Sequence, residues 1–162
     1  MKTTTFPAPA GHAAPRPAAT TVRAASTKDY SICADIWLAA SLAGHDFVPA
    51  AFWRGQLAVM AEHYLPSSQV LLLTADGEPA AFAATLPDGN GTYLAGLFVL
   101  PRWWGRGLGR QLLELVQEQV MAELPEQKNA SLRCTVYDKN SRALAFYARM
   151  GFLPIGRSIC PH

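Results

Sequence analysis

Charged residues and cysteines are scarce in this sequence. Asp, Glu, Lys and Arg together make up 16% of the 162 residues, and the formal net charge is +2. Because the basic residues are scattered along the chain, nothing favours a nucleic acid as partner over a small anionic ligand. The three cysteines are odd in number and far apart, which argues against a structural zinc site and favours a reducing compartment, by default the cytoplasm. They are Cys33, Cys134 and Cys160.

Long apolar runs are also missing. No stretch of about 18 apolar residues occurs, and no apolar signal segment follows Lys2, so we expect neither a membrane span nor a secretory signal. Residues 1–18 contain four prolines and no acidic residue, and this composition predicts a disordered tail. An acid-free leader also resembles a transit peptide, but its prolines oppose the amphipathic helix of such leaders. Residues 19–162 are predicted to form one domain.

A strand, a glycine-rich turn and a helix follow one another between Thr92 and Val116. The apolar run 93–100 ends at Pro101 and predicts a buried strand. Leucines recur at helical spacing from Leu108 onward, so the glycines stand where a helix begins. The first N–H groups of a helix have no partner inside it and bind anions. Glycines without Cβ atoms let a diphosphate approach that backbone, and two arginines add charge. The predicted binding residues are Gly105, Arg106, Gly107, Leu108, Gly109 and Arg110.

The glycine-rich turn matches neither of two common nucleotide-binding motifs. A dinucleotide fingerprint, G-x-G-x-x-G, fails because Arg110 or Leu112 occupies the last glycine position in the two possible registers. A phosphate-binding loop of the form G-x-x-x-x-G-K-[ST] does not occur. A turn with only a structural role is also compatible with the sequence.

Two motifs in the same order and at similar spacing carry a family resemblance. WGRGLGRQLL resembles the acyl-CoA pyrophosphate loop of the general N-acetyltransferase (GNAT) superfamily, with Gly107 and Gly109 at its two small positions. Trp104 stands where that family usually has Gln or Arg. NSRALAFYARMGF, residues 140–152, resembles the fourth helix of the family, N-x-x-A-x-x-F-Y-x-x-x-G-F. GHDFVPAAFW resembles a group of small bacterial members, and the resemblance covers about residues 20–157.

The sequence pattern and the resemblance together predict the fold. We expect an α/β fold with a mixed, largely antiparallel sheet, two central parallel strands and about four helices. The C-terminal strand of the family is expected to be missing, because only ten residues follow Phe152. Strand 130–137 would then keep an unpaired edge. Either residues 153–159 move into the vacant place, or a second copy of the chain supplies the pairing in a homodimer, or the chain is a truncated form with a weakened acceptor side.

Individual elements follow from local signals. In the first helix we expect Ile32, Ile36, Trp37 and Ala40 to face the core, and Gly44 to end the helix in the left-handed conformation. Asp76-Gly77 predicts a hairpin turn. Besides the strand at 93–100, strands are expected at 20–25, 69–74, 79–86, 130–137 and 153–159. Helices are expected after a capping box at 26–29, and at 49–64, 107–124 and 140–150.

The resemblance implies transfer of an acetyl group from acetyl-CoA to a primary amine, which is a small amine or a protein lysine or N-terminus. It places Leu97, Phe98 and Val99 along the pantetheine arm, with the amide of Phe98 or Val99 polarising the thioester carbonyl. Asn140 either caps its helix or also contacts the pantetheine. A non-catalytic protein that binds or senses acyl-CoA is the alternative from another class.

Two residues are predicted to move protons. Tyr147 occupies the position of the family's general acid, and the alternative is that it only packs. His45, with Asp46, is the best candidate for the base on the acceptor side, although an exposed His45 beside an Asp46 that caps a helix is equally compatible with the sequence. Cys134 is able in principle to carry an acetyl group, but its alternation with Leu132 and Val136 favours a core position.

Overall fold

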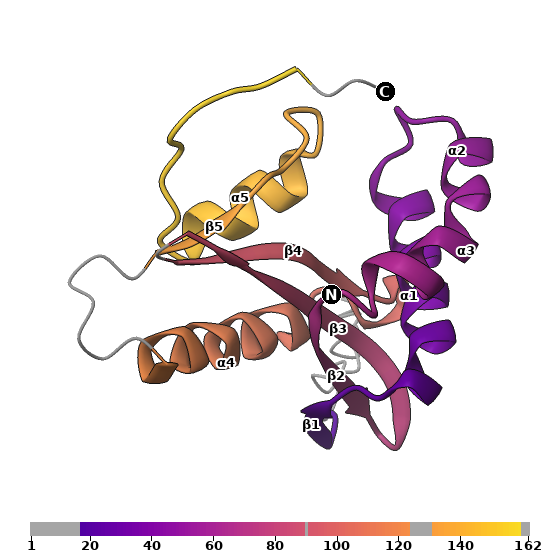
Figure 1. Cartoon of the computed structure of the whole chain (residues 1–162). Helices are drawn as coiled ribbons and strands as arrows, with labels where there is room; N and C mark the ends of the chain where they lie inside the picture. The colour runs from indigo at the N-terminus through magenta and orange to yellow at the C-terminus, as the bar shows by residue number, and fades with distance from the viewer. Residues whose placement is uncertain (1–16, 90, 124–130, 160–162) are drawn as a thin grey trace, which may run out of the picture.

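A five-stranded mixed sheet forms the centre of the protein, in the order β1-β2-β3-β4-β5. The computed structural model describes residues 17–89, 91–123 and 131–159. The first four strands pair antiparallel, and β5 pairs parallel to β4 at the edge of the described sheet (Figure 1). The strands are β1 (Thr20–Ala24), β2 (Gln69–Ala75), β3 (Glu78–Asp88), β4 (Gly91–Val99) and β5 (Leu132–Cys134). The predicted α/β fold and its parallel pair are confirmed. The tail at residues 1–16 lies outside the described residues.

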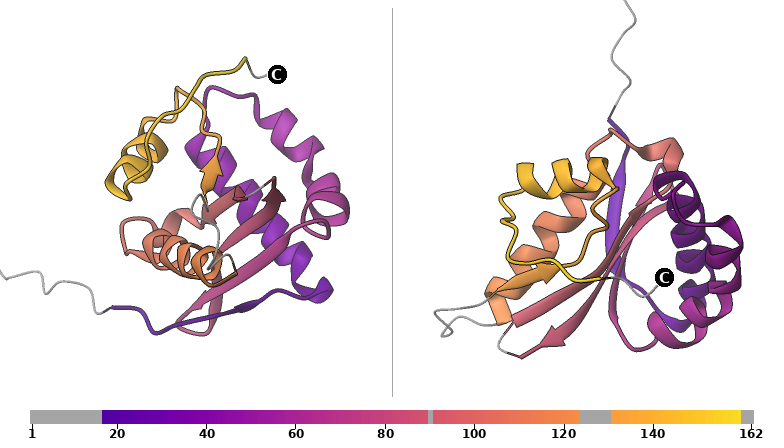
Figure 2. Two further views of the ribbon diagram at one scale, coloured as in Figure 1. Left: turned by 60° about the vertical axis from the view of Figure 1, so that its left-hand side comes forward. Right: turned by 90° about the horizontal axis from the view of Figure 1, so that it is seen from above.

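Helices cover both faces of this sheet (Figure 2). One face carries α1 (Tyr30–Gly44), α2 (Ala50–Gly55), α3 (Leu57–Val59) and the π-helical turn η2 (Met60–Tyr64). The other face carries α4 (Leu108–Glu123) and α5 (Ser141–Arg149), and short 3-10 turns η1 (Thr27–Asp29) and η3 (Pro101–Trp103) complete the fold. No helix in the described ranges combines the length and apolar character needed to span a bilayer.

Each face of the sheet has its own apolar core. Phe82 and Leu72 point into a core with α1 and α2, while Leu73 and Ala81 point into the core beneath α4. Because successive side chains of a strand alternate between faces, neighbouring residues serve the two cores. The leucine periodicity after Leu108 is confirmed as the face of α4 that covers the sheet.

Two expectations for α1 are wrong. Ile32 is 39% exposed, and Cys33, which is fully buried, takes its place against the sheet. Gly44 is the last residue of the helix, but its φ is not positive, and the chain leaves the helix at His45 with φ −132°. A helix that ends in this way needs no left-handed glycine.

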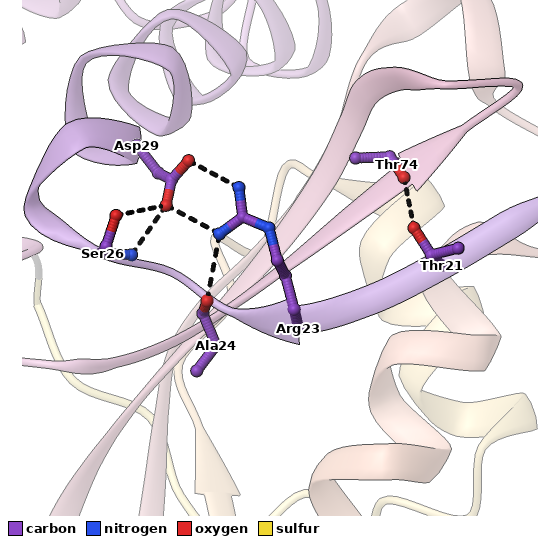
Figure 3. A network of polar contacts seen from close by, with 6 residues as sticks. All are labelled: Thr21, Arg23, Ala24, Ser26, Asp29 and Thr74. Carbon is purple, nitrogen blue, oxygen red and sulfur yellow. Dashed lines mark hydrogen bonds and ion pairs between the residues drawn. The ribbon is translucent and has the colours of Figure 1, made fainter.

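A partly buried ion pair anchors β1 to the start of α1 (Figure 3). The two terminal guanidinium nitrogens of Arg23 donate to Asp29, Nη1 at 2.8 Å to Oδ2 and Nη2 at 2.7 Å to Oδ1. Asp29 Oδ2 also accepts the backbone N–H of Ser26, as in the predicted capping box, and the Ser26 hydroxyl donates to the same oxygen. These bonds favour the ionised carboxyl, so the pKa of Asp29 lies well below its usual value, chiefly because of Arg23.

The predicted second helix is divided into three parts. It begins after Pro49 as expected, but α2 ends at Gly55, and the chain continues through α3 into η2. The break lies at Gly55-Gln56, where glycine has low helix propensity. The hairpin between β2 and β3 is confirmed, because Asp76 and Gly77 both have positive φ, as a type I′ turn requires.

The C-terminal elements are shorter than predicted. β5 comprises only Leu132–Cys134 rather than 130–137, because its pairing with β4 ends at Leu94. Of the predicted strand, Ala130 lies outside the described residues. Residues 153–159 form no strand in the described chain and pair with none of the five described strands.

Candidate active site

The glycine-rich loop between η3 and α4 presents an open backbone surface. Gly105 and Gly107 have φ values of +73° and +81°, which other L-residues rarely adopt. A Cβ atom added to either glycine would meet no atom within 4 Å, so the outer side of the loop is accessible. Gly109 is different, because its Cβ would touch Val99 and Phe146 at 3.6 Å. The first two glycines therefore shape the loop, and the third allows close packing of α4.

The loop also presents unpaired hydrogen-bond donors. Within the described chain, no N–H group of residues 105–110 donates to the backbone or to a side chain. The first N–H of the helix to be satisfied is that of Gln111, which donates to the carbonyl of Gly107 at 3.0 Å. Unpaired N–H groups at the positive end of a helix favour an anion. The residues present thus fit the diphosphate of an acyl-CoA.

The two arginines predicted for this loop are partly engaged elsewhere. Arg110 pairs with Glu114 on the same helix, with 2.7 Å between Nε and Oε1, and this bond raises the pKa of Arg110. Arg106 lies over the ring of Trp103, with its Cζ 4.8 Å from the ring centroid. Much of the charge of Arg110 is therefore balanced within α4.

Trp104 connects the loop to two other elements. Its indole Nε1–H donates to the carbonyl of Val99 at the end of β4, at 2.7 Å. On the face of the same ring lies Arg142 of α5, with its Cζ 4.1 Å from the centroid. The loop, the end of β4 and the first turn of α5 therefore meet at this tryptophan. No sequence pattern assigned a role to Arg142.

A bulge in β4 separates this strand from β5. Ala84 of β3 pairs with Gly96, whereas Thr85 pairs with Leu94, so Ala95 has no partner in β3. Pairing with β5 extends only from Thr92 to Leu94. Leu97, Phe98 and Val99 lie beyond the bulge, so their edge away from β3 pairs with no described strand. Gly96, which lies inside the predicted strand 93–100, is the feature of the sequence that indicates such a bulge.

Tyr147 lies near the point where β4 and β5 separate. It packs on the core beneath α4, and its ring contacts Phe146 and Phe152, each at 5.2 Å between centroids. Burial raises the pKa of Tyr147, and Cys134 and Tyr93 raise it further. The phenol is therefore protonated at neutral pH, as a general acid must be.

His45 and Asn140, which are 95 residues apart, meet directly. Asn140 Oδ1 accepts the N–H of Ala143, which confirms the predicted helix cap. Its amide Nδ2 therefore faces Nε2 of His45, 3.0 Å away. Because an amide nitrogen only donates, Nε2 must accept, and the ring proton is on Nδ1. Burial lowers the pKa of His45, so the ring is neutral at neutral pH.

Aromatic rings surround His45. Phe47, Trp53 and Tyr137 each lie with ring centroids between 5.3 and 5.7 Å from the imidazole. The Nδ1 atom of His45 and the Nε1 atom of Trp53 are buried without a hydrogen-bond partner in the described chain. Trp53 and Tyr137 belong to the core on the α1 face, opposite the face on which Tyr147 packs. The spacing of residues in the sequence did not indicate that Tyr137 lies beside His45.

Two further candidate residues take no part in this arrangement. Asp46 is exposed, forms no hydrogen bond with His45 within the described chain, and does not cap α2, whose N-cap is Pro49. The expected His45–Asp46 pair is therefore not formed. Burial raises the pKa of Cys134, so its thiol is less readily ionised, which agrees with a core position rather than a nucleophile.

The fold and the loop define an acyl-CoA-dependent transferase, and comparisons with known proteins give the family. Residues 33–152 match the acetyltransferase (GNAT) family, so the chain belongs to this family. It is an N-acetyltransferase, and the family uses acetyl-CoA. The chain is 30% identical over 131 residues to the peptidyl-lysine N-acetyltransferase YiaC of Escherichia coli, covering 81% of this chain and 82% of YiaC.

Solved structures show the same fold. The solution structure of apo YjaB from Escherichia coli has a TM-score of 0.67 and 26% identity, covering 86% of each chain. The PaiA N-acetyltransferase of Thermoplasma acidophilum, solved in complex with coenzyme A, has a TM-score of 0.71 and 16% identity. That comparison covers 82% of this chain and 88% of the PaiA chain.

Proposed function

We propose that this protein transfers the acetyl group of acetyl-CoA to lysine side chains of proteins or peptides. The observation that carries the proposal is the edge of β4 at Leu97, Phe98 and Val99, which pairs with no described strand and leads to the unpaired N–H groups of the loop at 105–110. An extended pantetheine arm is able to bond to such an edge as an added strand does. The diphosphate then meets the positive end of α4.

The acceptor class rests on the relatives. YiaC is named a peptidyl-lysine N-acetyltransferase, and so is YjaB of Salmonella typhimurium, which is 30% identical over 76% of this chain. Lysine is a primary amine on a long apolar stem, and the half-buried rings of Phe47 and Tyr137 beside His45 offer a surface on which such a stem packs. A protein lysine therefore suits this side of the site better than a compact polar amine.

The catalytic roles follow from protonation states. Acetyl-CoA supplies an activated thioester. The amide of Val99, which points away from β3, polarises its carbonyl, and Tyr147, held neutral by burial, donates a proton to the departing thiolate. His45 accepts the proton from the attacking amine at Nε2, and for this Nε2 must release the amide of Asn140. Asn140 keeps a second Nδ2 hydrogen that is available to the pantetheine.

The test uses acetyl-CoA and a panel of lysine peptides with blocked N-termini, following free thiol and peptide mass together. We expect thiol release matched by acetylated lysine. The variant Tyr147→Phe should lower kcat by about 10²-fold, the scale of one acid group, with little change in CoA affinity. Tyr64→Phe, at an exposed tyrosine of η2, is the matched control. No acetylated peptide from the wild type, or full activity of Tyr147→Phe, would contradict the proposal.

A further inference from the structure

No carboxylate of the described chain balances the charge of Arg142. It is the second residue of α5, where the positive end of the helix dipole opposes a cation. Arg23, Arg102, Arg110 and Arg133 each pair with a carboxylate, but no carboxylate in the described part of the chain pairs with Arg142. The exposed guanidinium is nevertheless held at one place, over the ring of Trp104. A cation placed in this way is suited to an anion from outside the chain.

The stacking leaves the guanidinium able to bind that anion. The guanidinium Cζ lies 4.1 Å from the centroid of the Trp104 ring, and within the described chain no acceptor occupies the N–H donors of Arg142. The Trp104 ring is itself held in place, because its indole Nε1–H donates to the carbonyl of Val99. The planar guanidinium holds its N–H donors in a fixed arrangement that matches the oxygen atoms of a phosphate group.

Trp104 directly precedes Gly105, so the stack brings Arg142 to the start of the open loop. The loop at 105–110 contributes unpaired N–H groups, and α5 contributes a full positive charge. Arg142 therefore adds a cation from a different element beside a loop that already contains Arg106 and Arg110.

We infer that Arg142 binds the diphosphate of acetyl-CoA and that Trp104 positions it for this contact. The inference rests on the proposed function for the identity of the donor substrate. It assigns the contact to the diphosphate rather than to the 3′-phosphate, because Trp104 directly precedes residues 105–110, whose N–H groups are unpaired.

Binding of CoA and donor kinetics test this role with three donors. Arg142→Ala should raise the Kd of CoA and the KM of acetyl-CoA about tenfold while kcat stays near the wild-type value, the size of effect expected for one charge-assisted hydrogen bond. With S-acetylpantetheine, which has no phosphate, the variant and the wild type should be equal. With acetyl-dephospho-CoA, which lacks only the 3′-phosphate, the tenfold loss should persist. Arg149→Ala, an exposed arginine in the last turn of α5, is the control and should leave every value unchanged.

A rescue experiment makes the assignment sharper. Trp104→Arg in the Arg142→Ala background should recover most of the lost CoA affinity, because it restores a cation at the loop itself. An unchanged Kd in Arg142→Ala, or an equal loss with S-acetylpantetheine, would overturn the inference. Disappearance of the effect with acetyl-dephospho-CoA would move the contact to the 3′-phosphate and would also refute it. These outcomes concern CoA affinity, so they are distinct from a failure of the wild type to acetylate lysine.

Discussion

At the scale of the residue, the pair His45–Asn140 links the acceptor side of the site to the cap of α5. The single lone pair of the neutral imidazole accepts from Asn140, while Asn140 Oδ1 is occupied by the Ala143 N–H. A protonated His45 has no lone pair to offer, so its charging breaks this link. Because burial lowers the pKa of His45 below 6.5, the link holds at neutral pH and is lost only as the pH falls through that lowered pKa.

This reasoning predicts the pH dependence of the reaction. For the wild type, kcat/KM should fall on the acidic side with an apparent pKa below about 6.5, the ordinary value for histidine. His45→Gln should lose this acidic limb and lower kcat by about 10²-fold, the scale of one base. The measurement is a pH profile of initial rates with a lysine peptide.

His63→Gln changes an exposed histidine of η2 and serves as the control, which should keep the wild-type profile. If His45→Gln keeps both kcat and the acidic limb, His45 is not the base. A rise confined to the KM of acetyl-CoA would instead assign His45 to the positioning of Asn140.

At the scale of the element, the loop before α4 depends on backbone conformation rather than on side chains. Gly107 combines a φ of +81° with open space above its Cα, and the helix that follows begins with unpaired N–H groups. A side chain at this position is strained and also projects into the space that a diphosphate needs. A carboxylate there repels the phosphates in addition.

We therefore predict that Gly107→Glu abolishes the rise in melting temperature that acetyl-CoA gives to the wild type. Gly89→Glu is a matched control, because Gly89 also has a positive φ and open surroundings but lies in the turn before β4, at the other end of that strand. Both variants should melt lower without ligand, and only Gly89→Glu should keep the shift. Thermal scans with and without acetyl-CoA measure the shift in melting temperature of each variant. An undiminished shift in Gly107→Glu would refute the assignment of this loop to the diphosphate.

At the scale of the whole molecule, the sheet is well covered on its faces but open at β5. No described strand pairs with the second edge of β5, and the segment after α5 exposes Leu153 and Ile155, each 82% accessible, and Ile159, 96% accessible. An unpaired edge and an exposed apolar segment together favour pairing between chains. We propose that two copies associate by placing residues 153–159 against β5.

Self-association should then depend on protein concentration, and Ile155→Lys should shift the equilibrium to the monomer by removing an apolar contact. Met121→Lys, at an exposed apolar position of α4, is the control and should leave association unchanged. Sedimentation at several concentrations, with hydrogen exchange of β5, measures both effects. A wild type that stays monomeric, with β5 amides as protected as those of β4, would contradict the prediction.

The sequence alone determined the features that arise from local interactions. Helical spacing after Leu108, the turn at Asp76-Gly77, the glycine loop and the Asn140 cap are read correctly because neighbouring residues create each of them. The family motifs lie within such local elements, so the membership in the acetyltransferase family was also accessible. Expectations at Ile32 and Gly44 failed because contacts from distant elements decide which side of a helix is buried and how the helix ends.

Only the tertiary structure decided which side chains meet. His45 reaches Asn140 because the loop after α1 and the start of α5 converge where β4 and β5 separate, and no periodicity encodes this convergence. The pairing of β5 ends at Leu94, next to the bulge at Ala95 in another strand. The stack of Arg142 on Trp104 likewise joins residues of different elements. Such contacts depend on how packed elements are oriented, and the free energy that fixes these orientations comes from non-local burial rather than from local propensity.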